Sequence, residues 1–100
     1  MAKAPELASQ FANSSLSRAR VRAFANHVSK VEADEGVEIK RALINGIPPF
    51  ENVPAVEFDV PRAKLGRIVD KLLSDPKLNP NIMIDGIPSV DVLRLRVIGR

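Results

Sequence analysis

Two short phrases of this chain are nearly identical, LINGIP at positions 43–48 and MIDGIP at 83–88. The similarity continues upstream of each phrase, where residues 18–28 align with residues 62–72. Both upstream stretches carry basic residues at their first and third places, and their apolar residues recur at the spacing of one helix face. A chain that repeats itself in this way is constrained to fold as two similar units.

The similarity also continues downstream, where VEFDV at 56–60 aligns with LRLRV at 93–97. Both segments alternate strictly between apolar and charged residues, which is typical of a β-strand with one buried face. Each half of the chain therefore predicts a helix, a strand, a turn and a second strand. We interpret the pattern as an internal duplication whose second copy has a shorter helix–strand connection and a shorter hairpin loop.

The predicted order αββαββ belongs to the α+β class. It resembles a circular permutation of the ferredoxin-like order βαββαβ, which implies a two-layer sandwich of one four-stranded antiparallel sheet with both helices on one face. Residues 16–60 and 61–100 are the two repeats of a single α+β domain that spans 16–100. Residues 1–15 form an N-terminal arm outside both repeats. These patterns indicate a fold but no sequence family.

In this arrangement the last strand of each half lies at the centre of the sheet, and the first strand of each half becomes an edge. The two central strands are expected to pair antiparallel. The predicted facing pairs are Phe58 with Leu95, Glu57 with Arg96, and Asp59 with Arg94. We expect the charged pairs to be exposed on the face away from the helices. They fix the register, because a slip by one residue would turn charges toward the core.

The helix and central-strand patterns also predict the core. Its expected members are Val21, Phe24, Val28, Val56, Phe58, Val60, Leu65, Ile68, Val69, Leu72, Leu93, Leu95 and Val97. The first strand of each half is less regular than the second. Val37, Ile39 and Leu43 indicate one phase of alternation, whereas Ile82 and Ile84 align with the other.

Local signals predict where the elements begin and end. A serine at 14, 15 or 17 is suited to cap the first helix, and Gly36 is suited to end it. Pro61 is suited to open the second helix. Pro76 is suited to end it, because a proline disfavours the α conformation of the residue before it. The Asn-Gly and Asp-Gly pairs of the two repeated phrases predict hairpin turns with positive φ angles, and the Ile-Pro that follows each pair predicts longer loops.

The sequence shows no set of catalytic or metal-binding residues. It has one histidine and no cysteine, so one chain can form neither a two-histidine metal site nor a thiolate site. A site formed by His27 and the nearby serines is disfavoured, because serines just before a helix usually cap it. The carboxylates at 32, 34, 35 and 38 suit a hard cation, but their spacing is not that of a calcium loop. We expect no cofactor, no bound metal, no small-molecule substrate and no enzymatic activity.

The composition limits the cellular locations expected for the protein. The apolar runs are too short to span a membrane, and the first ten residues lack the apolar segment of a signal peptide. We therefore expect no membrane association. The expected location is the cytoplasm, or a particle assembled there.

Charges along the predicted helices oppose the helix dipole. The first helix begins with arginines and ends with acidic residues, and the second helix begins with basic residues. The predicted partner-binding or anion-binding residues are Arg18, Arg20, Arg22, Arg62, Lys64, Arg67 and Lys71. These side chains either form a solvated helix surface or bind an anion or an acidic partner. The sequence leaves both interpretations open.

Three apolar side chains are predicted protein contacts. Leu7 and Phe11 lie on one side of a short helix expected in the N-terminal arm, and Phe50 lies at the tip of a proline-rich loop. The alternatives are that the arm packs on its own domain and that the loop folds back over the edge of the core.

The leading functional hypothesis is a non-enzymatic structural or adaptor protein. It would hold a protein partner, or further copies of itself, in a larger assembly such as a phage or mobile-element particle or a secretion-type complex. The first alternative is a nucleic-acid-binding accessory protein that uses the basic helix faces. A net charge of +3 is modest for that role, and the open sheet face lacks the aromatic residues with which ferredoxin-like RNA binders stack bases. The second alternative is a small inhibitor of a nucleic-acid-handling enzyme.

Overall fold

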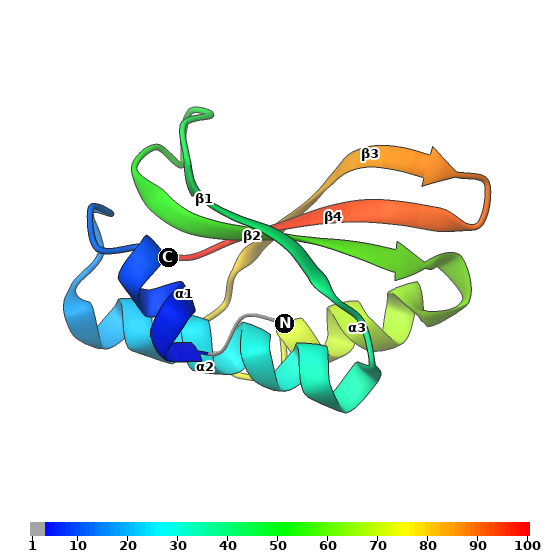
Figure 1. The fold of residues 1–100 in the computed structure, drawn as a ribbon, viewed down its shortest axis with the longest axis horizontal. Helices are drawn as coiled ribbons and strands as arrows, with labels where there is room; N and C mark the ends of the chain where they lie inside the picture. The colour runs from blue at the N-terminus through cyan, green and yellow to red at the C-terminus, as the bar shows by residue number, and fades with distance from the viewer. Residues whose placement is uncertain (1–3) are drawn as a thin grey trace.

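Figure 1 shows the computed structural model of the chain, which describes residues 4–100. Residues 1–3 of the predicted arm lie outside the described residues. The elements are helix α1 (Ala4–Gln10), helix α2 (Arg18–Glu35), strand β1 (Ile39–Asn45), strand β2 (Val53–Pro61), the short 3₁₀ helix η1 (Arg62–Lys64), helix α3 (Leu65–Leu72), strand β3 (Asn81–Ser89) and strand β4 (Val92–Ile98). All three α-helices of the described part lie on the same side of the sheet.

The four strands form one antiparallel sheet in the order β1-β2-β4-β3. Strands β2 and β4 are the last strands of the two halves, and they are central, as predicted. Their register pairs Phe58 with Leu95, Glu57 with Arg96, and Asp59 with Arg94. All three predicted pairs are confirmed, and so is the α+β two-layer class. The relation to a permuted ferredoxin-like fold stays a prediction.

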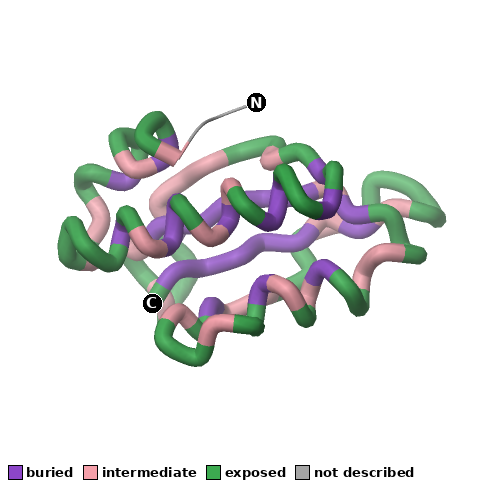
Figure 2. The backbone as a smooth tube through the Cα atoms, turned by 90° about the horizontal axis from the view of Figure 1, so that it is seen from below, coloured by how far each residue is buried: buried purple, intermediate pink, exposed green. Residues whose placement is uncertain are grey.

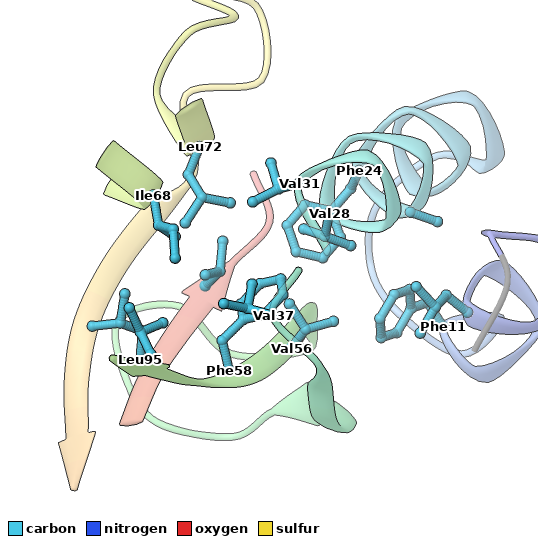
Figure 3. Packing of buried hydrophobic residues seen from close by; sticks show 14 of the residues in the cluster. Phe11, Phe24, Val28, Val31, Val37, Val56, Phe58, Ile68, Leu72 and Leu95 are labelled. Carbon is cyan, nitrogen blue, oxygen red and sulfur yellow. The ribbon is translucent and has the colours of Figure 1, made fainter. Parts of the chain in front are cut away.

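The core lies between the sheet and the helices (Figures 2 and 3). Every predicted core residue is buried except Leu65 and Val69, which are half-buried and pack against the others. The core is also larger than predicted. Val31 and Val37 extend it along the last turns of α2 to the approach of β1.

The predicted ends of α2 are confirmed, whereas the predicted end of α3 is wrong. The Ser17 side chain accepts a hydrogen bond from the Arg20 N–H at 3.2 Å, and Gly36 ends α2 in the left-handed conformation with φ of 64°. Pro61 is the last residue of β2 and leads into η1. Helix α3 ends at Leu72, four residues before Pro76, so the proline does not set its end. The Ser74 hydroxyl donates a hydrogen bond to the carbonyl oxygen of Lys71 at 2.7 Å. That bond satisfies one of the orphan carbonyls of the last turn.

A β-bulge explains why the phase of β1 was hard to predict. Ile39 pairs with Phe58 and Arg41 pairs with Glu57, so Lys40 is an extra residue on β1. The extra residue reverses the alternation, and the positions that pack on the core after the bulge are 42 and 44. The prediction that Leu43 shares the phase of Ile39 is therefore wrong.

The two repeated phrases differ in what they build, and the prediction that each closes a hairpin is wrong for the second. LINGIP ends β1 and begins the loop to β2, but MIDGIP lies inside β3, and the β3–β4 turn falls at residues 90 and 91. The pairing of β3 with β4 shifts register on both sides of Gly86, so the Asp-Gly pair lies in an irregular part of the strand and not in a turn. Among the described glycines only Gly36 has positive φ, so Gly46 and Gly86 do not supply the predicted turn conformation.

The central strand position of Phe58 leads to a stability prediction. Its side chain is fully buried, and we expect Phe58→Ala to lower the free energy of unfolding by about 3–5 kcal/mol, because it leaves a cavity in the core. Urea denaturation measures this change. The control is Val90→Ala in the exposed β3–β4 turn, which should change stability by less than about 0.5 kcal/mol. Equal losses at the two positions would contradict the core described above.

Candidate functional site

The basic stripe of the second half binds the end of α2. Lys64 Nζ donates to the main-chain oxygen of Glu35 at 2.9 Å, and Arg67 Nε lies 2.8 Å from Glu35 Oε1. Lys71 Nζ lies 3.4 Å from Glu35 Oε2 and 3.5 Å from Asp34 Oδ2. The side chain of Glu35 is 1% exposed, so this carboxylate is buried beneath the cations that neutralise it. The stripe thus joins α3 to α2.

This contact accounts for the unfavourable charge order on α2. Carboxylates at a helix C-terminus are destabilising by themselves, but here they receive Lys64, Arg67 and Lys71. Arg62, the fourth basic residue of this half, donates from Nε to the carbonyl oxygen of Val90 at 2.9 Å and so ties η1 to the β3–β4 turn. In the structure all four of these predicted binding residues have partners inside the chain.

The arginines at the start of α2 are placed differently. Arg18 and Arg22 are exposed, and neither forms a salt bridge with any residue from 4 to 100. Arg20 donates from Nη1 to the main-chain oxygen of Arg100 and so holds the residues that follow β4 beside α2. The basic clusters of the two halves align in sequence, but only the first leaves two guanidinium groups without a salt bridge in the described part of the chain.

Arg18 and Arg22 border a groove on the helical side of the molecule. It has a volume of about 590 Å³ and lies between α1 and the first turns of α2. Its apolar walls include Ala4, Ala8 and Leu16. Because Arg18 and Arg22 are four residues apart, they lie on one face of α2. The groove therefore combines apolar walls with two cationic groups at its border.

The N-terminal arm forms the other wall of this groove, and its apolar residues are inside the molecule. Leu7 and Phe11 are fully buried and belong to the main core cluster. The ring of Phe11 packs against Phe24 of α2 with centroids 5.9 Å apart (Figure 3). The expectation that Leu7 and Phe11 contact a partner is thus replaced by the alternative in which the arm packs on its own domain.

The proline-rich loop folds back over the other face of the sheet. The Asn45 amide donates to the carbonyl oxygens of Ile47 and Phe50, at 3.2 and 2.7 Å, and holds the loop in place. Phe50 is half-buried, and with Pro48 and Pro49 it lines a second groove of about 320 Å³ that reaches Met83 on β3. The tip of the loop is therefore tied to its own sheet, although part of Phe50 stays accessible.

The sheet face away from the helices carries a charged network that is less exposed than predicted. Arg96 Nη2 lies 2.9 Å from Glu57 Oε2 and 3.1 Å from Asp85 Oδ2, and Arg96 Nη1 donates to Asn45 Oδ1 at 3.1 Å. Arg41 Nε lies 3.0 Å from the other Glu57 oxygen. Glu57 and Arg96 are consequently buried, although they lie on the face without helices. Asn45 and Asp85 occupy equivalent places in the two repeated phrases, and both bind the same arginine.

A second ion pair on this face shifts the titration of its members. Arg94 donates to both carboxylate oxygens of Asp59, at 2.8 and 3.2 Å. This hydrogen bonding holds the pKa of Asp59 below its ordinary value of 3.8 and raises the pKa of Arg94 above its own. Arg94 and Asp59 carry opposite charges and form two parallel hydrogen bonds, so their contact helps to fix the register of β2 against β4.

The remaining polar residues show structural contacts. His27 Nε2 lies 2.9 Å from the carbonyl oxygen of Leu72 and links α2 to α3. Glu32 accepts from the Ile39 N–H at 2.7 Å, and Glu38 lies 3.5 Å from Lys40. Within residues 4–100 no group of three or more His, Cys, Asp or Glu side chains is arranged to hold a metal ion.

None of the helices within residues 4–100 is both long enough and apolar enough to cross a membrane.

Comparisons with known proteins give no relative. No protein-family model, no curated protein and no solved structure matches this chain. The site therefore has to be interpreted from its own geometry.

Sequence reasoning found the arginines of the groove but missed its walls. The signal was present: Ala4 and Ala8 are four residues apart and place small side chains on one face of α1, and Ala12 follows in the turn after it. The pairing of Asn45 and Asp85 with Arg96 was also missed, because both residues were assigned to turns.

The contact between α3 and α2 predicts a large effect at Glu35. We expect Glu35→Gln to lower the free energy of unfolding by about 1–3 kcal/mol, because it leaves Arg67 and Lys71 facing a neutral group. The measurement is chemical denaturation at neutral pH. Glu38→Gln is the matched control, since the one salt bridge of Glu38 within residues 4–100 is with exposed Lys40. An equal loss in the control would show that Glu35 has no special structural role.

The lowered pKa of Asp59 predicts a pH-dependent contribution. We expect Asp59→Asn to lower the free energy of unfolding by about 0.2–1 kcal/mol at pH 7. Because the pKa is lower in the folded protein than the ordinary 3.8, the wild-type advantage is complete above that value. It disappears as the pH falls through the folded pKa, where the carboxyl becomes protonated.

Denaturation curves of the two proteins over a range of acidic pH check this prediction. Glu51→Gln, in an exposed loop position without a salt bridge in the described chain, should show no such convergence. A stability difference at Asp59 that is independent of pH would contradict the assignment.

Proposed function

We propose that this chain is a non-enzymatic interaction protein that docks an acidic, amphipathic segment of a protein partner in the groove between α1 and α2. The observation that carries the proposal is the pair Arg18 and Arg22, exposed and without salt bridges among the described residues, at the border of a groove of about 590 Å³ with apolar walls. Such a role is that of an adaptor within a larger assembly.

The distribution of charges elsewhere makes this pair informative. Lys64, Arg67 and Lys71 are engaged with the end of α2, and Arg94 and Arg96 with carboxylates of the sheet. Long cationic side chains at a protein surface are commonly solvated, so exposure alone carries little weight. The combination with apolar walls favours a partner that offers carboxylates on one side and apolar groups on the other.

An α-helix meets that requirement. Residues spaced three or four apart on a helix share a face, so a helical segment can insert an apolar stripe into a groove and present acidic residues along the stripe's border. The groove already lies between two helices, and a third would pack against them at ordinary interhelical spacing. Charge complementarity with Arg18 and Arg22 would set the orientation of the segment.

The alternatives fit this surface less well. Binding of nucleic acid rests mainly on phosphate contacts from many basic side chains, and the apolar walls beside Arg18 and Arg22 offer nothing to a phosphate backbone. An inhibitor that occupies a nucleic-acid site would present acidic side chains, whereas the unpaired charges here are basic. The assembly in which the adaptor works stays a prediction from the sequence.

Peptide selection tests the proposal. We expect a display library of random peptides panned on the protein to enrich sequences that combine acidic and apolar residues at helical spacing. Soluble copies of these peptides should shift the backbone amide resonances of α1 and of the first turns of α2. The double variant Arg18→Glu, Arg22→Glu should weaken their binding by at least about tenfold, because each substitution replaces attraction by repulsion.

The matched control is Lys30→Glu, Lys77→Glu, which changes the net charge equally at two exposed positions that do not line this groove. It should leave peptide affinity nearly unchanged. Enrichment of peptides without acidic residues, or resonance shifts confined to other elements, would contradict the proposal. So would tight, strongly salt-dependent binding to a random DNA duplex that the same arginine variant abolishes, which would favour the nucleic-acid alternative.

A further inference from the structure

The outer edge of β3 is a strand edge with exposed apolar side chains. Strand β3 pairs with β4 on one side only, and the sheet ends there. Met83, Ile84 and Ile87 are 38%, 58% and 64% exposed. A strand edge presents main-chain N–H and C=O groups that can accept another strand, and soluble proteins usually protect such edges with charges, prolines or bulges.

The opposite edge of the sheet is protected in these ways, whereas the first half of β3 is not. Strand β1 carries a bulge at Lys40, and the side chains of Lys40 and Arg41 are exposed. In β3 the protective features come late, because the register shifts begin after Ile84 and Pro88 lies near the end. Residues 81–84 therefore form a regular, uncharged stretch at the edge of the sheet.

A polar atom at the start of this stretch lacks a partner. The Nδ2 atom of Asn81 is buried and has no hydrogen-bond acceptor within the described residues. A buried donor without an acceptor costs about 1–3 kcal/mol. Asn81 and Met83 also line the groove of about 320 Å³ next to Pro48 and Phe50. This part of the surface thus combines an apolar groove with a free strand edge, above a buried amide donor that has no acceptor.

We propose that two copies of the chain pair through this edge, with residues 81–84 of β3 antiparallel to the same residues of the second copy. The pairing would join the two sheets into one continuous sheet of eight strands. It concerns a surface different from the groove between α1 and α2, so it can be true or false independently of the proposed function.

The chemistry of the strand is the reason for choosing a second copy as the occupant. A two-fold interface brings each residue close to its own counterpart, so it suits a strand without unpaired charge. The stretch from 81 to 84 is uncharged, and the carboxylate of Asp85, which follows it, is bound to Arg96. The same operation applied to β1 would bring Lys40 and Arg41 against their own copies.

The symmetry also restricts the register. Residues that face each other across an antiparallel pair lie on the same face of the sheet. Met83 pairs with Arg96, on the face away from the helices, while Ile82 and Ile84 pair with residues of the opposite face. If the two-fold axis is perpendicular to a continuous sheet, it must therefore lie midway between one residue and the same residue of the second copy. One side chain among Ile82, Met83 and Ile84 then meets its own copy.

Because the chain has no cysteine, single-cysteine variants test this geometry directly. We expect one of Ile82→Cys, Met83→Cys and Ile84→Cys to form a disulfide-linked dimer rapidly under mild oxidation, since facing Cβ atoms lie within the range of a disulfide. The control variants are Lys40→Cys on the other edge and Leu73→Cys, which is 45% exposed in the wild type at the end of α3. Both should stay monomeric on denaturing gels.

Light scattering over a range of concentrations gives the second measurement. The wild type should form a dimer as its concentration rises, and Ile84→Lys should weaken dimerisation by at least about tenfold, because the lysines of the two copies would repel each other. Leu73→Lys should leave it unchanged. A wild type that stays monomeric at every concentration, or a dimer in which none of the three β3 cysteines links faster than the controls, would overturn the proposal.

Discussion

The pairing of β2 with β4 is the contact on which the rest of the structure depends. These strands come from different halves of the chain and form the middle of the sheet. Phe58 faces Leu95 toward the helices, and Glu57 faces Arg96 on the opposite side. A shift by one residue would bury charges beneath the helices and expose the aromatic ring, so both faces enforce the same register. The edges, the helices and the grooves take their positions from this central pair.

The charges of the molecule divide into groups that hold the fold and groups that do not. The acidic end of α2 is unfavourable by itself, but it becomes the acceptor for the basic stripe of α3, and Glu35 is almost completely buried there. In the sheet, Arg94 forms an ion pair with Asp59 and Arg96 forms one with Glu57. Arg18 and Arg22, at the start of α2, have no salt bridge among residues 4–100 and lie next to apolar walls. The location of unpaired charge, more than its amount, is what distinguishes the proposed interaction surface.

The sequence predicted the central register, a serine cap at 14, 15 or 17, and most of the core. Apolar periodicity shows which side chains are buried, and only one register of the two central strands pairs their opposite charges. The sequence did not predict the bulge at Lys40, since an extra residue is fixed by the neighbouring strand and not by its own stretch of chain. The Asp-Gly pair at 85 and 86 predicts a turn for a similar reason. Its turn propensity comes from the two residues themselves, whereas its place inside β3 is decided by pairing with β4. The groove depends on how α1 packs against α2, and only tertiary structure brings these helices together.

The convergence of Asn45 and Asp85 on Arg96 limits how far the two similar halves are independent. One half supplies Asn45 and Glu57, and the other supplies Asp85 together with the arginine itself. Each half keeps one partner of its own, Arg41 for Glu57 and Asp85 for Arg96. Asn45 Oδ1 and Glu57 Oε2, however, accept from Arg96 of the other half. Whatever the origin of the repetition, the two halves now share one buried polar network around Arg96.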